Sequence, residues 1–472
     1  MEALSDKDIA ACLDVLARLA ERPADPALEP VRRAVDLAHR SSKKHRRAAR
    51  REERREHDQG LIAAARRFQD ENPRPLPLLT TLGHIDSPMA DPVDDIDGDR
   101  TRLRGERRCY VCKQGYRQVD REYHMLCPSC ATENMRRRHA RCDLSGRRAL
   151  VTGGRIKIGF HTALKLLRDG AEVMVTTRFP RDAARRFAAV PDAPAWLDRL
   201  AVHGVDLLDL PAVLGLVEVV RERWGTLDIL VNNAAPTIRR PPEYHREVSD
   251  AEQHPLTGLP TAVVMSGATR HAVVGGVGRR SIGSGPSSAP VDWTEFFPVG
   301  ARDETGEPLD LRRSNTWVQG LDEVSPREWL EVHVINAFVP FLLTGQLRPL
   351  LAKAPMPDRY VVQVSAMEGS FGRSRKTSRH PHTNMAKAAL NMLTRTVADE
   401  YATEGIYMSS VDTGWVTDER PHAAKQAERA NGFRPPLDVI DGAARVYDPI
   451  VRGVRGEPVY GVFLKDYRQV PW

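Results

Sequence analysis

The chain has no run of about 18 apolar residues, and its first residues, MEALSDKDIA, do not form a charged segment followed by an apolar one. We therefore expect no membrane-spanning segment and no secretory leader, and a cytoplasmic location with no membrane partner. Aromatic residues make up only 6% of the 472 residues, but 41% of them are hydrophobic, which is enough for a sizeable core. The length predicts two or three domains.

Acidic residues are few in one basic segment near the start of the chain. The net charge is +7, and residues 32–58, RRAVDLAHRSSKKHRRAARREERREHD, form a dense basic run. Two interpretations of this run stay open. It is either the solvated face of a helix, or a surface that binds nucleic acid or an acidic partner.

Cysteine is scarce, and four of the six cysteines are clustered. Residues 109–130, CYVCKQGYRQVDREYHMLCPSC, have the spacing C-x2-C-x14-C-x2-C, which favours metal over disulfides in a chain without a secretion signal. Four thiolates suit tetrahedral structural zinc and leave no open position for catalysis. Such a module binds nucleic acid or mediates protein contacts, and both interpretations stay open. The predicted ligands are Cys109, Cys112, Cys127 and Cys130, with His124, His139 and Cys142 as nearby spares.

Composition divides the chain into four parts. A helix is predicted over residues 5–22, with Ser5 as its N-cap. Within the last part, residues 267–290 are rich in Gly and Ser and are expected to be mobile. The predicted parts are a basic helical arm (1–70), a Pro- and Asp-rich linker (71–104), a zinc-ribbon-like module (105–143) and an α/β domain (144–472) with an insertion (236–324).

Short apolar strands alternate with helical segments from residue 144 onward. This alternation predicts an α/β fold with a doubly wound parallel sheet. The predicted strands are 148–154, 171–178, 200–209, 227–235, 359–369 and 406–416, and the predicted helices are 161–170, 211–225, 325–351 and 383–399.

The first strand runs into a glycine turn, VTGGRIKIG (151–159). Glycine lets the backbone approach a pyrophosphate, and the following helix N-terminus favours its negative charge. Here the chain resembles the short-chain dehydrogenase/reductase family, whose TG-x-x-x-G-x-G fingerprint is matched at Thr152, Gly153 and Gly159. Further matches with the family's motifs are Asn232 to Ala235 in NNAA, Asn336 in HVINAF, Lys387, and Gly414 and Thr417 in DTGWVT.

The resemblance implies a Rossmann-like fold and an NADP(H)-dependent oxidoreductase with a small-molecule or carrier-bound substrate, and a homo-oligomer is expected. In the family an acidic residue after the second strand selects NAD, whereas Arg178 here can pair with the 2′-phosphate of NADP. Arg155 can add a second cation, and Lys157, in place of the middle glycine, is either a phosphate ligand or a solvent-facing lysine. The expected cofactor-binding residues are Gly153, Arg155, Lys157, Ile158, Gly159, Arg178, Asp206, Asn232, Ala234, Lys387 and Thr417.

The catalytic positions depart from the family's pattern. Its tyrosine, which donates the proton, stands four residues before the lysine, and this position is Thr383. Lys387 matches the lysine that holds the ribose, and Asn336 matches the asparagine that supports a water chain. The serine position falls on Ala366 by counting from the next glycine. Ser365 is then either the catalytic serine, displaced by one residue, or an ordinary strand-end serine.

Histidine is the alternative proton donor. His380 lies seven residues before Lys387, on the same helix face, and the enoyl reductase branch of the family places its tyrosine at this spacing. His382 is the second candidate. The other interpretation is that HPHT only begins a helix, with Thr383 as N-cap. Two hypotheses for the protein follow: an oxidoreductase with an unusual proton donor, or an NADPH-binding pseudoenzyme that acts as a sensor or an interaction protein. A third is a nucleic-acid or protein-binding scaffold.

Overall fold

The computed structural model describes residues 5–69, 101–267, 292–372 and 376–472. Most of the predicted linker 71–104, and all but the first residue of the Gly- and Ser-rich stretch 267–290, lie outside the described residues. The predicted division into domains stays a prediction.

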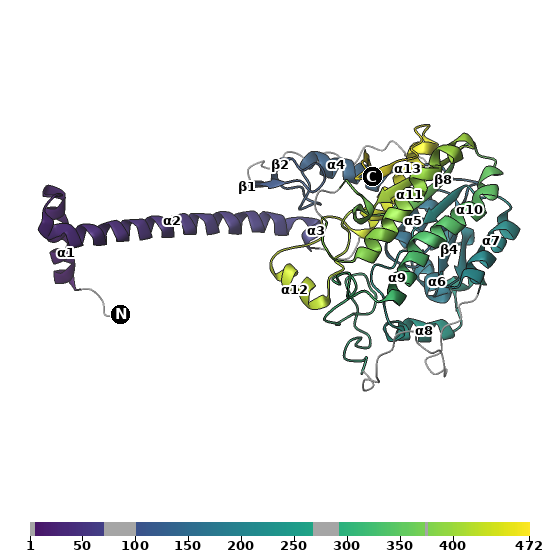
Figure 1. Cartoon of the computed structure of the whole chain (residues 1–472), viewed down its shortest axis with the longest axis horizontal. Coiled ribbons are helices and arrows are strands. Elements are labelled where there is room, and N and C mark those ends of the chain that lie inside the picture. The colour runs from purple at the N-terminus through teal and green to yellow at the C-terminus, as the bar shows by residue number, and fades with distance from the viewer. Residues whose placement is uncertain (1–4, 70–100, 268–291, 373–375) are drawn as a thin grey trace.

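A long helical arm projects from the rest of the molecule (Figure 1). Its first helix begins as predicted, because the Ser5 hydroxyl accepts the backbone N–H of Asp8 while the Asp8 carboxylate accepts the N–H of Ser5. The second helix contains the basic run, and Ile62 is its only residue that the structure buries. The arm consists of α1 (Asp6–Glu21), η1 (Pro26–Leu28), α2 (Glu29–Ala64) and α3 (Arg66–Gln69).

The α/β domain contains a nine-stranded sheet in the order β11-β10-β9-β8-β6-β3-β4-β5-β7. All neighbouring strands are parallel except β10 and β11, which form an antiparallel pair at one edge. This confirms the predicted fold class. The strands are β3 (Arg148–Val151), β4 (Glu172–Thr177), β5 (Leu200–Gly204), β6 (Ile229–Asn232), β7 (Val264–Gly267), β8 (Arg359–Ser365), β9 (Ile406–Asp412), β10 (Phe463–Lys465) and β11 (Arg468–Val470).

Helices cover both faces of the sheet, and each face has its own core. Apolar residues of α5, α6 and α13 pack on one face, and those of α7, α10 and α11 pack on the other. The helices are α5 (Lys157–Arg168), α6 (Pro180–Ala188), α7 (Leu210–Trp224), α8 (Arg246–Gln253), α9 (Pro326–His333), α10 (Val339–Ala352), α11 (Pro381–Thr403), α12 (His422–Ala430) and α13 (Val439–Val454). Shorter turns are η2 (Ala193–Ala195), η3 (Leu197–Arg199), η4 (Pro242–His245), η5 (Leu259–Ala262), η6 (Val334–Phe338) and η7 (Met367–Gly369).

The predicted helix 325–351 is present as α9, a π-helical turn η6, and α10 in succession. Among the described residues this stretch, Pro326–Ala352, is the one helix long and apolar enough to cross a membrane by length and composition. One side of it packs against the sheet through Val339, Leu343 and Leu347, which are fully buried, so a core position accounts for this part of its apolar character.

Two parts of the sheet were not predicted. The insertion contributes β7, which pairs with β5 in parallel and extends the sheet by one strand. Its four residues are largely exposed and carry no alternating pattern, so the sequence gives no strand signal there. The antiparallel pair β10–β11 near the C-terminus was also missed, because each of its strands has only three residues.

The cysteine segment forms a small separate unit beside the sheet. It consists of a two-stranded antiparallel sheet, β1 (Arg102–Arg108) and β2 (Gly115–Gln118), and the helix α4 (Pro128–Arg138). In Figure 1 β1 and β2 lie above the inner end of α2, and α4 lies beside the C-terminal end of the chain and contacts α13. It begins at β1, slightly before the predicted boundary at residue 105.

Candidate functional site

A cavity of about 1220 Å³ lies at the carboxyl ends of the parallel strands. This edge is where ligands bind open α/β sheets, and the strand order reverses there between β3 and β6. Each cofactor-binding residue predicted from the sequence lines the cavity, except Asn232. The catalytic candidates Lys387, Ser365 and His380 line it too, whereas Asn336 and His382 do not.

The glycine turn between β3 and α5 forms one wall. A Cβ atom at Gly159 would lie 2.3 Å from the carbonyl oxygen of Gly153 and 2.4 Å from Nδ2 of Asn233, so only glycine fits. Gly153 has φ +68° and Lys157 has φ +52°, which is the left-handed region where glycine is favoured. Lys157 thus occupies the family's glycine position at a cost in backbone strain, and its Nζ lies 3.8 Å from Glu419.

The residues at the end of β6 differ in whether they line the cavity. Asn232 is buried and donates from Nδ2 to Gln363 at 3.0 Å, so its side chain stabilises the sheet and does not line the cavity. The prediction that its side chain binds cofactor is therefore not supported by the geometry. The next residues, Asn233 and Ala234, do line the cavity, and their N–H groups are both held by the hydroxyl of Thr152 at 2.9 and 3.0 Å.

Two arginines flank the Phe179 ring after β4, with their guanidinium carbons 5.4 Å (Arg155) and 5.5 Å (Arg178) from the ring centre. Arg155 is buried and donates to Asp182 at 2.6 Å and to Glu307. These two carboxylates neutralise it, which weakens the prediction that it binds a 2′-phosphate. Arg178 is exposed, and its guanidinium lies 3.2 Å from Nε2 of His245.

Lys387 is buried, and its Nζ donates to the carbonyl oxygen of Val364 at 2.8 Å. Burial lowers the pKa of this lysine to about 8, against a smaller raising effect of Glu368. Asn336 lies in the π-helical turn and donates to Val332 at 2.9 Å, while its Oδ1 is buried without a partner among the described residues. The predicted role of Asn336 in a water chain stays a prediction.

The structure gives less support for a catalytic role of Ser365 and Thr383 than for one of Lys387. Ser365 ends β8 and lines the cavity together with Ala366, and its hydroxyl donates to Oδ1 of Asn391 at 2.6 Å. This bond favours the strand-end interpretation, although the oxygen can still accept. Thr383 is buried in the first turn of α11 and does not cap the helix, because α11 begins at Pro381 and His380 is its N-cap.

The structure separates the two candidate histidines. His380 lines the cavity, its ring stacks on Trp317 with centres 4.1 Å apart, and its Nδ1 lies 3.1 Å from Oδ1 of Asn384. Its φ of +42° is unusual for a non-glycine residue, and such strain is concentrated at functional sites. His382 is buried beside Glu328, 3.8 Å away, and faces a different hollow.

Burial, together with smaller effects of the neighbouring His380 and His333, lowers the pKa of His382 to about 4. The ring is therefore neutral near pH 7. Both its position outside the cavity and its charge state argue against His382 as the proton donor.

Several lining residues were missed by sequence reasoning. Asp412 ends β9, is buried, and accepts the N–H groups of Met367 at 2.7 Å and Gly414 at 2.9 Å. Lys465 lies 3.4 Å from the same carboxylate. Asp412 could have been found, because it is a polar residue at a strand end beside the predicted loop motif. Tyr110, from the cysteine unit, lines the cavity beside Trp415, which lies 305 residues later in the sequence, and no local pattern predicts this.

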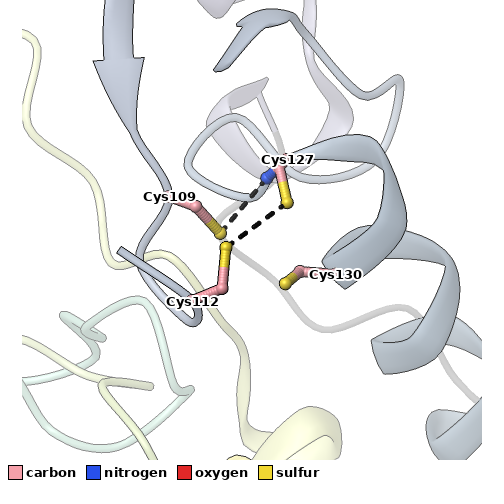
Figure 2. A group of neighbouring side chains, drawn as sticks. All are labelled: Cys109, Cys112, Cys127 and Cys130. Carbon is pink, nitrogen blue, oxygen red and sulfur yellow. Dashed lines mark hydrogen bonds between the residues drawn. The ribbon is translucent and has the colours of Figure 1, made fainter. Parts of the chain in front are cut away.

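The four predicted cysteine ligands converge (Figure 2). Their sulfur atoms all lie within 4.8 Å of one another, with Cys112 and Cys127 sulfurs 3.7 Å apart. The spare ligands point elsewhere: His124 lies 3.3 Å from the carbonyl oxygen of Arg434, and Cys142 lies 3.2 Å from the hydroxyl of Tyr447. Four thiolates and no open position are the donor set of a closed, structural metal site.

Comparison with known families gives two matches along the α/β domain. The family model for short chain dehydrogenases matches residues 147–255, and that for enoyl-(acyl carrier protein) reductases matches residues 315–435. The two matches leave out the arm, the cysteine unit and most of the insertion.

Individual proteins resemble the chain over different extents. An uncharacterized protein of Acanthamoeba polyphaga mimivirus is 35% identical over 356 residues, or 73% of this chain and 71% of that protein. Carbonyl reductase (NADPH) 1 of Sus scrofa is 41% identical over 87 residues, 18% of this chain and 29% of that protein. (−)-Isopiperitenone reductase of Mentha piperita is 36% identical over 226 residues, 48% of this chain and 58% of that protein.

Solved structures resemble the α/β domain at lower identity. The NADPH-bound carbonyl reductase from chicken fatty liver is 18% identical, with a TM-score of 0.44, and the match covers 70% of this chain and 100% of that chain. A short chain dehydrogenase from Burkholderia cenocepacia in complex with NADP is 21% identical, with a TM-score of 0.44, and covers 68% and 97%.

Proposed function

The chain belongs to the short-chain dehydrogenase/reductase family, and we propose that it is an NADP(H)-dependent oxidoreductase with an unusual proton donor. The observation that carries the proposal is the single cavity that joins the glycine turn to Lys387. When bound, the cofactor supplies hydride transfer. The chain's own residues must hold it, orient it and exchange a proton with the substrate.

The preference for NADPH over NADH rests on the end of β4. Arg178 lines the cavity there, and Thr177 and Arg178 stand where an acidic residue would select NAD. A guanidinium forms charge-assisted bonds with a phosphate, and a carboxylate would repel it. The glycine turn adds Lys157 on the same wall, so both predicted phosphate contacts come from residues that can reach the cavity.

The proton donor is proposed to be His380. It lines the cavity as the N-cap residue of α11, outside the helix itself, so the predicted shared helix face with Lys387 does not apply. The Trp317 ring stacks on it and Asn384 lies 3.1 Å from its Nδ1, and these contacts fix the plane of the ring. Lys387 would hold the ribose of the cofactor, since its position one and a half turns into α11 points its ammonium toward the end of β8. The substrate class is left open. Arg239 and Arg240 line the cavity, but Arg239 donates to Glu331 at 2.8 Å and Arg240 donates to Asp310, so their charges are already neutralised.

A pseudoenzyme that binds NADPH is the second candidate. It is favoured by the loss of the family's tyrosine and by the Ser365 hydroxyl, which is occupied by Asn391. One experiment separates the two: titration of purified protein with NADPH and NADH by fluorescence, followed by NADPH oxidation with a panel of carbonyls, imines and activated alkenes. Tight NADPH binding with turnover supports the enzyme. Tight binding without turnover, with a cocrystal structure in which protein blocks the reacting face, supports the pseudoenzyme.

We also propose that the cysteine cluster binds one structural Zn²⁺. The converging sulfurs support this, because four thiolates brought together without a cation would repel one another once deprotonated. Metal analysis of purified protein should give about one zinc per chain. Protein without metal, with all four thiols reactive toward a thiol reagent, would refute the assignment.

A homo-oligomer in the cytoplasm is proposed as the working form. Large apolar side chains are exposed along η6, α10 and α11, namely Phe338, Phe341, Met385 and Met392. A second copy of the chain can cover such a face by a two-fold contact. Light scattering would measure the assembly, and Phe341→Asp should shift it toward the monomer. The basic arm leaves nucleic acid as an untested partner.

A further inference from the structure

Tyr110 stands between the first two cysteines of the cluster and reaches the cofactor cavity. Its hydroxyl oxygen accepts the backbone N–H of Trp415 at 2.9 Å, and its ring lies 5.8 Å from Nζ of Lys465. Trp415 belongs to the loop 413–417 that follows β9 and lines the cavity. Tyr110 therefore connects the cysteine unit to a wall of the cavity.

Tyr110 is held on both sides by the cysteine cluster. Cys109 precedes it and Cys112 follows two residues later, and both sulfurs belong to the group of four (Figure 2). The backbone N–H of Tyr110 donates to Met125 at 2.8 Å, and the N–H of Cys127 donates to the Cys109 sulfur at 3.3 Å. The backbone of Tyr110 is thus held directly beside two of the four sulfurs.

The cysteine unit is fastened to the α/β domain by a buried polar network. Arg138 on α4 donates to Asp438 at 2.6 Å and to Asp441 at 2.8 Å, at the start of α13. The hydroxyl of Tyr123 donates to Asp441 at 2.9 Å. Asp438 is also the N-cap of α13, so the network fixes this helix as well. This network holds α4 and the start of α13 together. It does not include residues 109–112, the segment that carries Tyr110 and two of the four cysteines.

The apolar core of the unit is continuous with the cavity loop. Buried Leu437 and partly buried Val416 belong to the same cluster of apolar side chains as Cys109, Cys127 and Tyr110. Gly414 has φ +78°, and a Cβ there would lie 2.6 Å from Leu437 and 3.6 Å from the Tyr110 hydroxyl. Leu437 and the Tyr110 hydroxyl thus both lie close against the loop.

We propose that Tyr110 is a positioning residue through which a metal ion bound by the four cysteines holds the loop 413–417 in place and keeps the cofactor cavity in its binding shape. The cysteine unit is then a structural part of the cofactor site and not a separate binding module. Two parts of this inference rest on the proposed function: that the four cysteines bind a metal ion, and that the cavity binds NADPH. The effect on the loop is measured without cofactor.

Hydrogen exchange of the full-length protein tests the inference through the peptide that contains Trp415. Tyr110→Phe removes one acceptor and keeps the ring and the cysteines, so it should keep about one zinc per chain. Because a hydrogen bond of this kind contributes about 1 kcal/mol, exchange of the Trp415 amide should be about fivefold faster. Tyr116→Phe is the matched control, since the Tyr116 hydroxyl donates to His124 inside the unit and does not line the cavity. It should leave the Trp415 amide unchanged.

Removal of the zinc with a chelator should accelerate the same amide in the wild-type protein, and added Zn²⁺ should restore it. In Tyr110→Phe the chelator should add little to the rate, because both changes act through one contact and are therefore not additive. The NADPH dissociation constant should be about three- to tenfold higher for zinc-free wild type and for Tyr110→Phe than for zinc-replete wild type. Tyr116→Phe should bind NADPH as tightly as zinc-replete wild type.

Two results would overturn the inference. One is a Trp415 amide whose exchange is the same in wild type, zinc-free protein and Tyr110→Phe. The other is purified protein without metal. If chelation unfolds the whole cysteine unit, the zinc-replete Tyr110→Phe variant alone decides. Failure of the wild type to bind NADPH would refute the proposed cofactor and leave the exchange comparison valid.

Discussion

At the β3–α5 turn the cavity wall is made of backbone and glycine from one continuous segment, whereas at the ends of β8 and β9 it is made of side chains from distant parts of the chain. Gly153 and Gly159 lie six residues apart. On the other side, Tyr110, Trp317 and Lys465 reach the cavity from the cysteine unit, the insertion and β10. The first half follows the family's pattern at Gly153 and Gly159 and departs from it at Lys157, and the second half departs from it at the position of the proton donor.

The difference shows where a fold can be altered. A turn that closes around a pyrophosphate has no spare volume, so its residues are dictated by steric contact. A proton donor needs only a suitable group at a suitable distance, which a residue from another segment can supply. The following changes test whether the two halves differ in this way.

The largest effect on turnover is expected for His380→Ala, in the part of the cavity wall at the ends of β8 and β9. Loss of a general acid should slow turnover about 10²- to 10⁴-fold with little effect on NADPH affinity. His382→Ala is the control, because that ring is buried outside the cavity and its pKa of about 4 keeps it neutral. Equal rates for wild type and His380→Ala in a steady-state assay would remove His380 as the proton donor.

In the first half, Gly159→Ala should weaken NADPH binding by at least about 100-fold, since the new methyl group overlaps the Gly153 carbonyl and the turn must open. Gly215→Ala, inside α7 with open space around it, should instead stabilise the protein by about 0.5–1 kcal/mol. Isothermal titration and thermal melting measure the two outcomes. A Gly159→Ala protein with unchanged affinity would show that this turn does not contact the cofactor.

Arg178→Asp should reverse the cofactor preference. A charge-assisted contact contributes about 1.5–3 kcal/mol, so NADPH should bind about ten- to a hundredfold more weakly while NADH gains a partner for its ribose. Arg221→Asp changes the same charge on α7, where the arginine pairs with Glu218 on the surface, and should leave the ratio unchanged. The ratio of the two dissociation constants is the measurement, and equal values in wild type would contradict the proposal.

Buried Lys387 should lower the free energy of unfolding while it contributes to NADPH binding. Its pKa falls from 10.5 to about 8 on folding, so between these values the unfolded state binds more protons and stability rises with pH. Below pH 8 the full penalty remains. Lys387→Met should therefore raise the free energy of unfolding at pH 7 by about 1–3 kcal/mol and weaken NADPH binding. Denaturant unfolding at pH 7 and pH 10 checks both signs, and a less stable Lys387→Met protein would contradict them.

The smallest effect concerns Lys157→Gly. Glycine relieves the left-handed conformation at this position, a gain of about 1 kcal/mol, but loses backbone entropy of similar size. The melting temperature should change by only a few degrees. NADPH affinity should fall by less than about tenfold if Lys157 contacts a phosphate, and an unchanged dissociation constant would identify it as a solvent-facing lysine.

Much of this could be predicted from local sequence. The Ser5 capping box, the α/β alternation and the glycine turn each depend on residues a few positions apart, and the structure has all three. The four cysteines also converge as their spacing predicts. Strand β7 and the neutral state of His382 could not be predicted, because burial and edge pairing depend on neighbours that no local pattern identifies.

The sequence by itself determined the doubly wound domain, the glycine turn and the cysteine cluster, because periodicity and motif spacing act over short distances along the chain. Tertiary structure alone decided that Arg155 is occupied by Asp182 and Glu307, that His380 and not His382 faces the cavity, and that Tyr110 reaches the loop after β9. The physical reason is that side-chain partners, burial and cavity walls arise from contacts between segments far apart in sequence, and these exist only once the chain is folded.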